Sequence, residues 1–75
     1  MIKSEELSNP NSCLNKAKDD EILFVVLDRD LSFADTIRYW IGKRIELGLN
    51  QPGDSKLVEA EETAQKVLRK QQGEN

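Results

Sequence analysis

The chain has to fold without any internal cross-link. Its 75 residues include one cysteine, Cys13, and no histidine. A lone thiol cannot form an intrachain disulfide, and without histidine or further cysteine it cannot build a structural zinc site. Small proteins compensate for a limited apolar core with disulfides, metals or association. We therefore expect this chain to be completed by self-association into a homo-oligomer.

Length and charge limit the classes of function. A chain of 75 residues has room for one domain. Its 14 acidic residues against 11 basic ones argue against sequence-independent nucleic-acid binding, which needs a basic face. No apolar run approaches the length of a membrane span, and the acidic start has no apolar core, unlike a signal peptide. We expect a cytoplasmic protein with no membrane partner.

The beginning of the chain predicts little regular structure. Residues 1–11 are polar and show neither helical nor strand periodicity, so we predict a flexible N-terminal arm. A single small domain is expected over 12–72, with a tail at 73–75. Ser12 can cap a short helical turn at 13–18, because its hydroxyl can accept a hydrogen bond from a free amide of the first turn.

One apolar run, residues 22–27, stands out from this polar context. Its length and its β-branched and aromatic content favour a buried strand over a helix. A lone strand leaves its backbone donors and acceptors unpaired. We expect either a short strand that pairs with its twin in another subunit or a packed extended segment.

Two amphipathic helices are predicted at about 32–47 and 55–71. Apolar residues recur there every three or four positions, which indicates one core-facing side on each helix. The short turn between the helices requires antiparallel packing, so the predicted fold class is mostly α, built on a two-helix hairpin. The two apolar stripes are Ala34, Ile37, Ile41 and Ile45, with Phe33 and Trp40 on the flank, and Leu57, Ala60, Ala64, Val67 and Leu68.

The ends of these helices also carry signals. Ser32 and Asp35 have the spacing of a capping box. Asp54 or Ser55 is expected to cap the second helix. Gly48 is well placed to end the first helix in a left-handed conformation.

No catalytic motif is present. The sequence lacks a Gly-rich phosphate loop, a Ser/His/Asp set and paired cysteines, and without histidine it lacks the commonest general base. We predict a protein that is not an enzyme and has no cofactor or metal. A metal-dependent enzyme remains the last-ranked alternative, because clustered carboxylates can hold a hard cation. The carboxylates concerned, which we interpret instead as solvated or near a helix N-terminus, are Asp19, Asp20, Glu21, Asp28 and Asp30.

Three other side chains have a structural and a functional interpretation. Cys13 would be a reactive thiol if a neighbouring lysine lowered its pKa, but a role as a small buried hydrophobe is preferred. Trp40 can fill the core or stack on a ring, and the core is preferred. Arg38, at the edge of the apolar stripe, can hold a phosphate or carboxylate bidentately or pair with Asp30 or Asp35, and both interpretations stay open.

The strings Cys13-Leu14-Asn15-Lys16-Ala17, Asp20-Glu21, Phe24-Val25, Asp30 and Ile37-Arg38-Tyr39-Trp40 carry a resemblance. Over roughly residues 13–47 the chain resembles a family of very small proteins of unknown function encoded in tailed-phage and prophage genomes. That family reads like C-L-x-K-A, then D-E-P-x-F-V-L-x-A-x-D, then V-R-x-W. This sequence departs from it at Ile22, where proline is usual, and at Asp28, where alanine is usual.

We therefore expect a phage accessory protein that binds a host factor and antagonises host defence. In one version it sequesters a nucleotide signal, with Lys16 and Arg38 on phosphate and Phe24 or Trp40 against the base. The alternative is a protein-binding adaptor with no small ligand. The candidate ligand-binding residues are Lys16, Asp20, Glu21, Phe24, Arg38 and Trp40.

Overall fold

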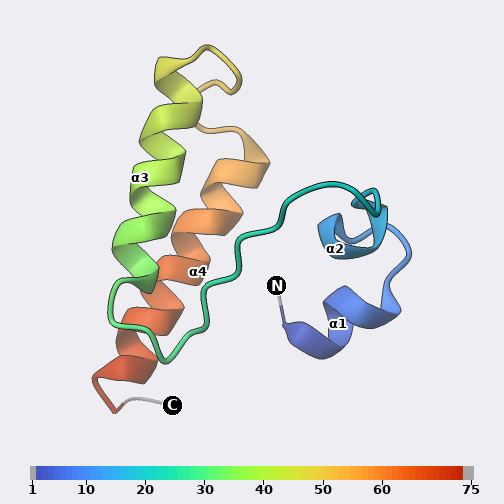
Figure 1. Cartoon of the computed structure of the whole chain (residues 1–75). Coiled ribbons are helices and arrows are strands. Elements are labelled where there is room, and N and C mark those ends of the chain that lie inside the picture. Colours follow the sequence, from blue (N-terminus) through green and yellow to red (C-terminus); the bar gives the residue numbers. More distant parts are fainter. Residues whose placement is uncertain (1, 74–75) are drawn as a thin grey trace.

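A computed structural model describes residues 2–73, which form four helices and no strand (Figure 1). The mostly helical fold class is confirmed. The predicted tail lies outside the described residues except for residue 73. None of the helices in 2–73 has the length and hydrophobicity that a membrane crossing requires. The helices are α1 (Lys3–Ser8), α2 (Cys13–Lys16), α3 (Phe33–Glu46) and α4 (Ser55–Gln71).

The two long helices, α3 and α4, lie side by side and run in opposite directions (Figure 1). Small residues account for most of the buried positions, because Ala34, Ala60 and Ala64 are at most 2% exposed. Leu57 and Val67 are the other buried apolar side chains in the described chain. The core of the described chain is therefore small.

Gly48 ends α3 as the sequence predicts. Its φ of 72° is left-handed. Its amide donates to the carbonyl of Ile45 at 3.0 Å, and the amide of Leu49 donates to the carbonyl of Arg44 at 3.0 Å. These two bonds form a Schellman motif, which satisfies carbonyls that the end of the helix leaves free.

Replacing Gly48 by alanine is expected to lower the free energy of unfolding by about 1 kcal/mol, because a Cβ is strained in the left-handed region. Gly42, in the middle of α3, is the matched control. A Cβ there would meet no atom within 4 Å. Gly42→Ala should therefore stabilise the helix by about 0.5–1 kcal/mol. Urea unfolding followed by circular dichroism measures the change in the free energy of unfolding of each variant. Changes of the same sign in the two variants would contradict the left-handed conformation of Gly48.

The two long helices begin without the side-chain caps that the sequence predicts. Ser32 donates from its amide and its hydroxyl to Asp30 Oδ1, at 2.8 and 2.7 Å, so its hydroxyl is occupied outside the helix. The Asp54 carboxylate accepts from the Asn50 side chain at 3.0 Å and from the Gln51 amide at 2.9 Å. Both residues therefore stabilise the loop before the helix rather than its first turn.

Within the predicted flexible arm, Lys3–Ser8 form a helix that contacts α2. Asn15 is the main link, because its side-chain amide donates to the carbonyls of Glu6, Leu7 and Asn9 at 2.8, 3.1 and 2.8 Å. Buried Ser12 donates to the Glu6 carbonyl at 2.6 Å and accepts from the Asn15 amide at 3.2 Å, which confirms its predicted capping role. The domain boundary expected after residue 11 therefore falls between α1 and α2, which these hydrogen bonds hold together.

Candidate interaction surface

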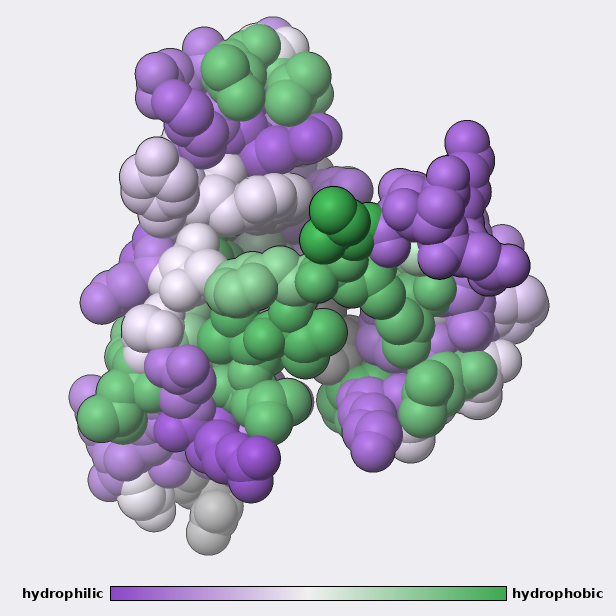
Figure 2. All heavy atoms as spheres, in the orientation of Figure 1, coloured by the Kyte–Doolittle hydropathy of each residue, from purple (hydrophilic) through white to green (hydrophobic). Residues whose placement is uncertain are grey.

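Residues 22–27 form neither a helix nor a strand and connect α2 to the turn before α3 (Figure 1). We call them the apolar segment. Within the single chain that the structure describes, this run forms no strand, and it is not packed as the second of the two expectations requires. Five of the six side chains are exposed, with Ile22 at 99% and Phe24 at 84%. In the view of Figure 2, apolar residues gather in the middle of the molecule, beside the α3–α4 pair.

The backbone of the apolar segment is also unpaired. Within residues 2–73, no amide from Ile22 to Leu27 donates a hydrogen bond. The carbonyl of Leu27 accepts from the Asp30 amide at 2.9 Å. An apolar run with free donors can accept a second strand, which would satisfy the backbone and set apolar side chains of the two strands beside one another.

The C-terminal end of the apolar segment is fixed to α4. Lys70 Nζ pairs with Asp28 Oδ2 at 2.6 Å. The side-chain amide of Gln71 donates to the carbonyls of Asp28 and Asp30 at 2.9 and 2.8 Å. Hydrogen bonds from Ser32 hold the pKa of Asp30 below its ordinary value. These bonds hold the C-terminal end of the apolar segment against α4.

The carboxylates considered for a hard cation are not assembled into a site. No three residues of the metal-ligating types His, Cys, Asp and Glu lie together within 2–73. Asp28 and Asp30 are instead held by α4 and by Ser32. Asp19 and Asp20 are exposed in the loop after α2.

Arg38 pairs with Glu61 on α4 rather than with Asp30 or Asp35. Its Nε and Nη2 donate to the two carboxylate oxygens of Glu61 at 3.1 and 3.0 Å. These bonds raise the pKa of Arg38 and lower the pKa of Glu61. Because the two side chains keep 45% and 36% of their surface exposed, the pair contributes little to stability. A ligand phosphate would have to displace Glu61.

Trp40 is exposed, at 37%. The guanidinium of Arg44 stands 5.6 Å from the centre of its ring, which is cation–π distance. Arg44 is held in turn by Asn50, whose side-chain oxygen accepts from its Nε at 2.7 Å. Trp40 therefore neither fills the core fully, as preferred from the sequence, nor presents both ring faces to a ligand.

The remaining candidate residues belong to the N-terminal half of the chain and are exposed: Cys13, Lys16, Asp20 and Glu21. The preferred interpretation of Cys13 as a buried hydrophobe is wrong, because Cys13 is exposed at the start of α2 and no residue of α2 is buried. Glu21 accepts from the Lys18 amide at 2.7 Å. No hydrogen bond or ion pair in the described chain joins these residues to Arg38 or Trp40, because no contact joins α1 or α2 to α3 or α4.

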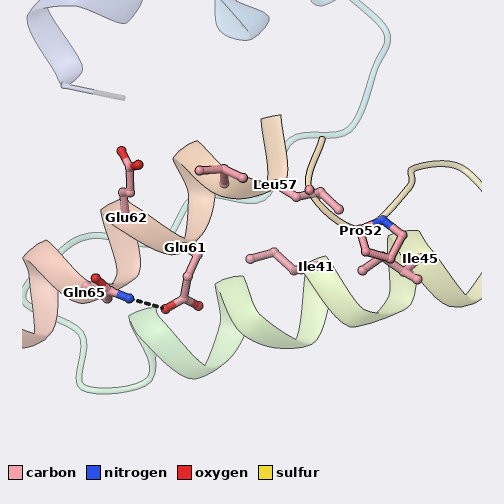
Figure 3. A pocket seen from close by; sticks show the side chains of 9 residues that line it. Ile41, Ile45, Pro52, Leu57, Glu61, Glu62 and Gln65 are labelled. Carbon is pink, nitrogen blue, oxygen red and sulfur yellow. Dashed lines mark hydrogen bonds between the residues drawn. The ribbon is translucent and has the colours of Figure 1, made fainter. Parts of the chain in front are cut away.

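The structure has an open apolar groove between α3 and α4 that we did not predict from the sequence (Figure 3). Ile41 and Ile45 line it from α3, Leu57 lines it from α4, and Pro52 closes it from the turn. Glu61 also lines the groove, and its carboxylate accepts a hydrogen bond from the Gln65 side-chain amide at 3.2 Å. The sequence does not predict that Pro52 lines this groove, because the position of the turn depends on how the two helices pack.

Acid is expected to destabilise the fold through three carboxylates. Hydrogen bonds lower the pKa values of Asp30, Asp54 and Glu61 below the ordinary 3.8 for aspartate and 4.5 for glutamate. A lowered pKa contributes stability above the ordinary value, and that stability is lost as the pH falls through the lowered one. The melting temperature should thus be constant at pH values above about 5 and should decrease as the pH is lowered past about 4. Glu61→Gln should make the fall shallower, whereas the exposed control Glu59→Gln should not.

These observations define a small helical protein with an exposed apolar segment and no enclosed ligand site among its described residues. Comparison with known proteins finds no matching protein family, no matching curated protein and no matching solved structure.

Proposed function

We propose that this chain is a non-enzymatic accessory protein that self-associates and binds a host factor. The observation that supports this most strongly is the apolar segment, which is exposed in both its side chains and its backbone. Contiguous exposed apolar surface marks interaction sites in soluble proteins. The resemblance to tailed-phage proteins supports a role in the infected cell, where the bound factor would belong to host defence.

Self-association is favoured by the size of the core. Among residues 2–73, three of the five buried apolar residues are alanines, and Leu57 is the largest buried apolar side chain. The apolar surface that the chain leaves uncovered is contributed by larger residues such as Phe24 and Ile22. A second copy that covers these side chains would supply the apolar burial that a single copy lacks.

A nucleotide is the concrete host factor that fits the exposed residues. Lys16 is exposed at the end of α2 and can approach a phosphate, and Trp40, which lies outside the apolar segment, is 37% exposed and can stack on a base. Arg38 is a weaker candidate than the sequence suggests, because Glu61 already occupies its guanidinium. The protein-binding alternative uses the same apolar surface with no small ligand.

The test is to retain host molecules on the immobilised full chain, release them by heat, and identify them by mass spectrometry. The proposal predicts one small molecule or one protein that is retained by the wild type and rebinds in isothermal titration. Lys16→Ala should weaken binding of a nucleotide at least tenfold, whereas Lys56→Ala, an exposed lysine on α4, should not. Failure of the folded oligomer to retain any factor would overturn the binding function.

A further inference from the structure

We infer that residues 22–27 of two copies pair as antiparallel strands, with Val25 facing itself at the twofold axis, which brings Glu21 of each copy close to Arg29 in the turn that follows the other strand. The inference rests on the self-association proposed above and specifies the segment, direction and register through which it occurs.

A second copy fits this segment because each copy offers what the other lacks. Amides from Ile22 to Leu27 donate to no acceptor in the described chain, and carbonyls from Ile22 to Val26 accept from no donor there. An extended chain presents donors and acceptors along its edge, so a second identical segment can satisfy both sets. No other run in the described chain combines six apolar residues with a free backbone.

Charge selects the antiparallel direction. The apolar run is preceded by Glu21 and followed by Asp28 and Arg29. Parallel pairing in register would set Glu21 against Glu21 and Asp28 against Asp28, and like charges directly opposite are destabilising. Antiparallel pairing removes both contacts.

Charge also selects the register. When Val25 faces Val25, Leu23 faces Leu27 and Phe24 faces Val26. The strand pair then ends with Glu21 beside the turn that carries Arg29 of the other copy. A shift of one residue would set Glu21 against Asp28. Arg29 makes no ion pair within residues 2–73, and Asp28 is already paired with Lys70. The chosen register therefore uses the free cation and leaves the existing ion pair intact.

The pairing combines backbone hydrogen bonds with apolar contacts across the strands. Leu23 would lie beside Leu27 and Phe24 beside Val26 of the other copy. Apolar cross-strand pairs of this kind stabilise paired strands.

Cysteine cross-linking tests the register. In a Cys13→Ser background, which removes the native thiol, single cysteines replace Leu23, Phe24, Val25 and Val26, and mild oxidation is followed on non-reducing gels. Val25→Cys should form covalent dimer at least tenfold faster than its neighbours, because only this residue faces its own copy within disulfide range. Equal cross-linking at all four positions would indicate parallel pairing, and fastest cross-linking at Phe24→Cys another register. Either result overturns the inference.

Charge exchange tests the Glu21–Arg29 contact without a disulfide. Glu21→Arg and Arg29→Glu should each weaken the dimer about tenfold, because each creates two like-charge contacts. The double variant Glu21→Arg/Arg29→Glu keeps the net charge and should restore wild-type affinity in sedimentation equilibrium. If the double variant is as weak as the single variants, the pairing is wrong.

The two proposals fail differently. A folded wild-type monomer at every concentration would overturn both the proposed self-association and this pairing. An oligomer in which Val25→Cys does not cross-link faster than its neighbours would overturn the pairing alone.

Discussion

Ala64→Leu is expected to lower the free energy of unfolding by about 3 kcal/mol and the melting temperature by about 15 °C. Ala64 is fully buried where α4 meets α3. Three added carbons have no space there unless the two helices separate, and separation would expose Leu57 and Val67. Because a domain of this size has only several kcal/mol of stability, the loss should be visible as partial unfolding at room temperature.

Lys66→Leu is the control for this substitution. Lys66 is an exposed neighbour on the same helix and makes no hydrogen bond or ion pair among the described residues. Its replacement should change stability by less than about 0.5 kcal/mol. Thermal unfolding followed by circular dichroism compares the two variants. Equal melting temperatures would mean that α3 and α4 do not pack through Ala64.

Leu23→Asp is expected to weaken self-association by at least a hundredfold. The substitution introduces a carboxylate into the middle of the apolar segment, where the pairing would set it twice against Leu27 of the other copy without a counter-ion. The monomer should keep its helices, because Leu23 is 55% exposed. Sedimentation velocity measures the association, and circular dichroism checks the helix content.

Leu31→Asp is the matched control. Leu31 is 81% exposed, more than Leu23, but it lies after the proposed strand pair, in the turn that leads into α3. It should leave the association constant within about threefold of wild type. Equal weakening by the two substitutions would indicate a general effect of added charge and would contradict a role for the apolar segment.

The long helices could be predicted because their signals are local. Apolar spacing indicated the faces that α3 and α4 bury, and Gly48 indicated where α3 ends. The caps at Ser32 and Asp54 could not be predicted equally well. Each side chain had a second acceptor or donor within a few residues, and a short motif cannot rank these partners.

The helix α1 was missed because it has no apolar periodicity to detect. Its stabilising contacts come from Asn15, seven residues beyond its last residue, through bonds to three carbonyls. A signal did exist, since an asparagine after an Asn-Pro-Asn turn is a good partner for free carbonyls at a helix end. To recognise this signal, one would have to know in which direction the chain continues after Pro10.

The partner of Arg38 depends on tertiary structure. From the sequence, Asp30 and Asp35 were the nearest carboxylates, whereas the structure selects Glu61, 23 residues away. Only the packing of α3 against α4 brings the two side chains together. The same reason explains why the sequence could not separate a ligand-binding arginine from a structural one.

Sedimentation equilibrium of the full chain at micromolar concentration shows directly whether a second copy completes this fold. We expect a mass of at least two chains of 8.5 kDa, with dissociation on dilution and in Leu23→Asp. A cooperatively folded monomer of 8.5 kDa across the whole concentration range would contradict it.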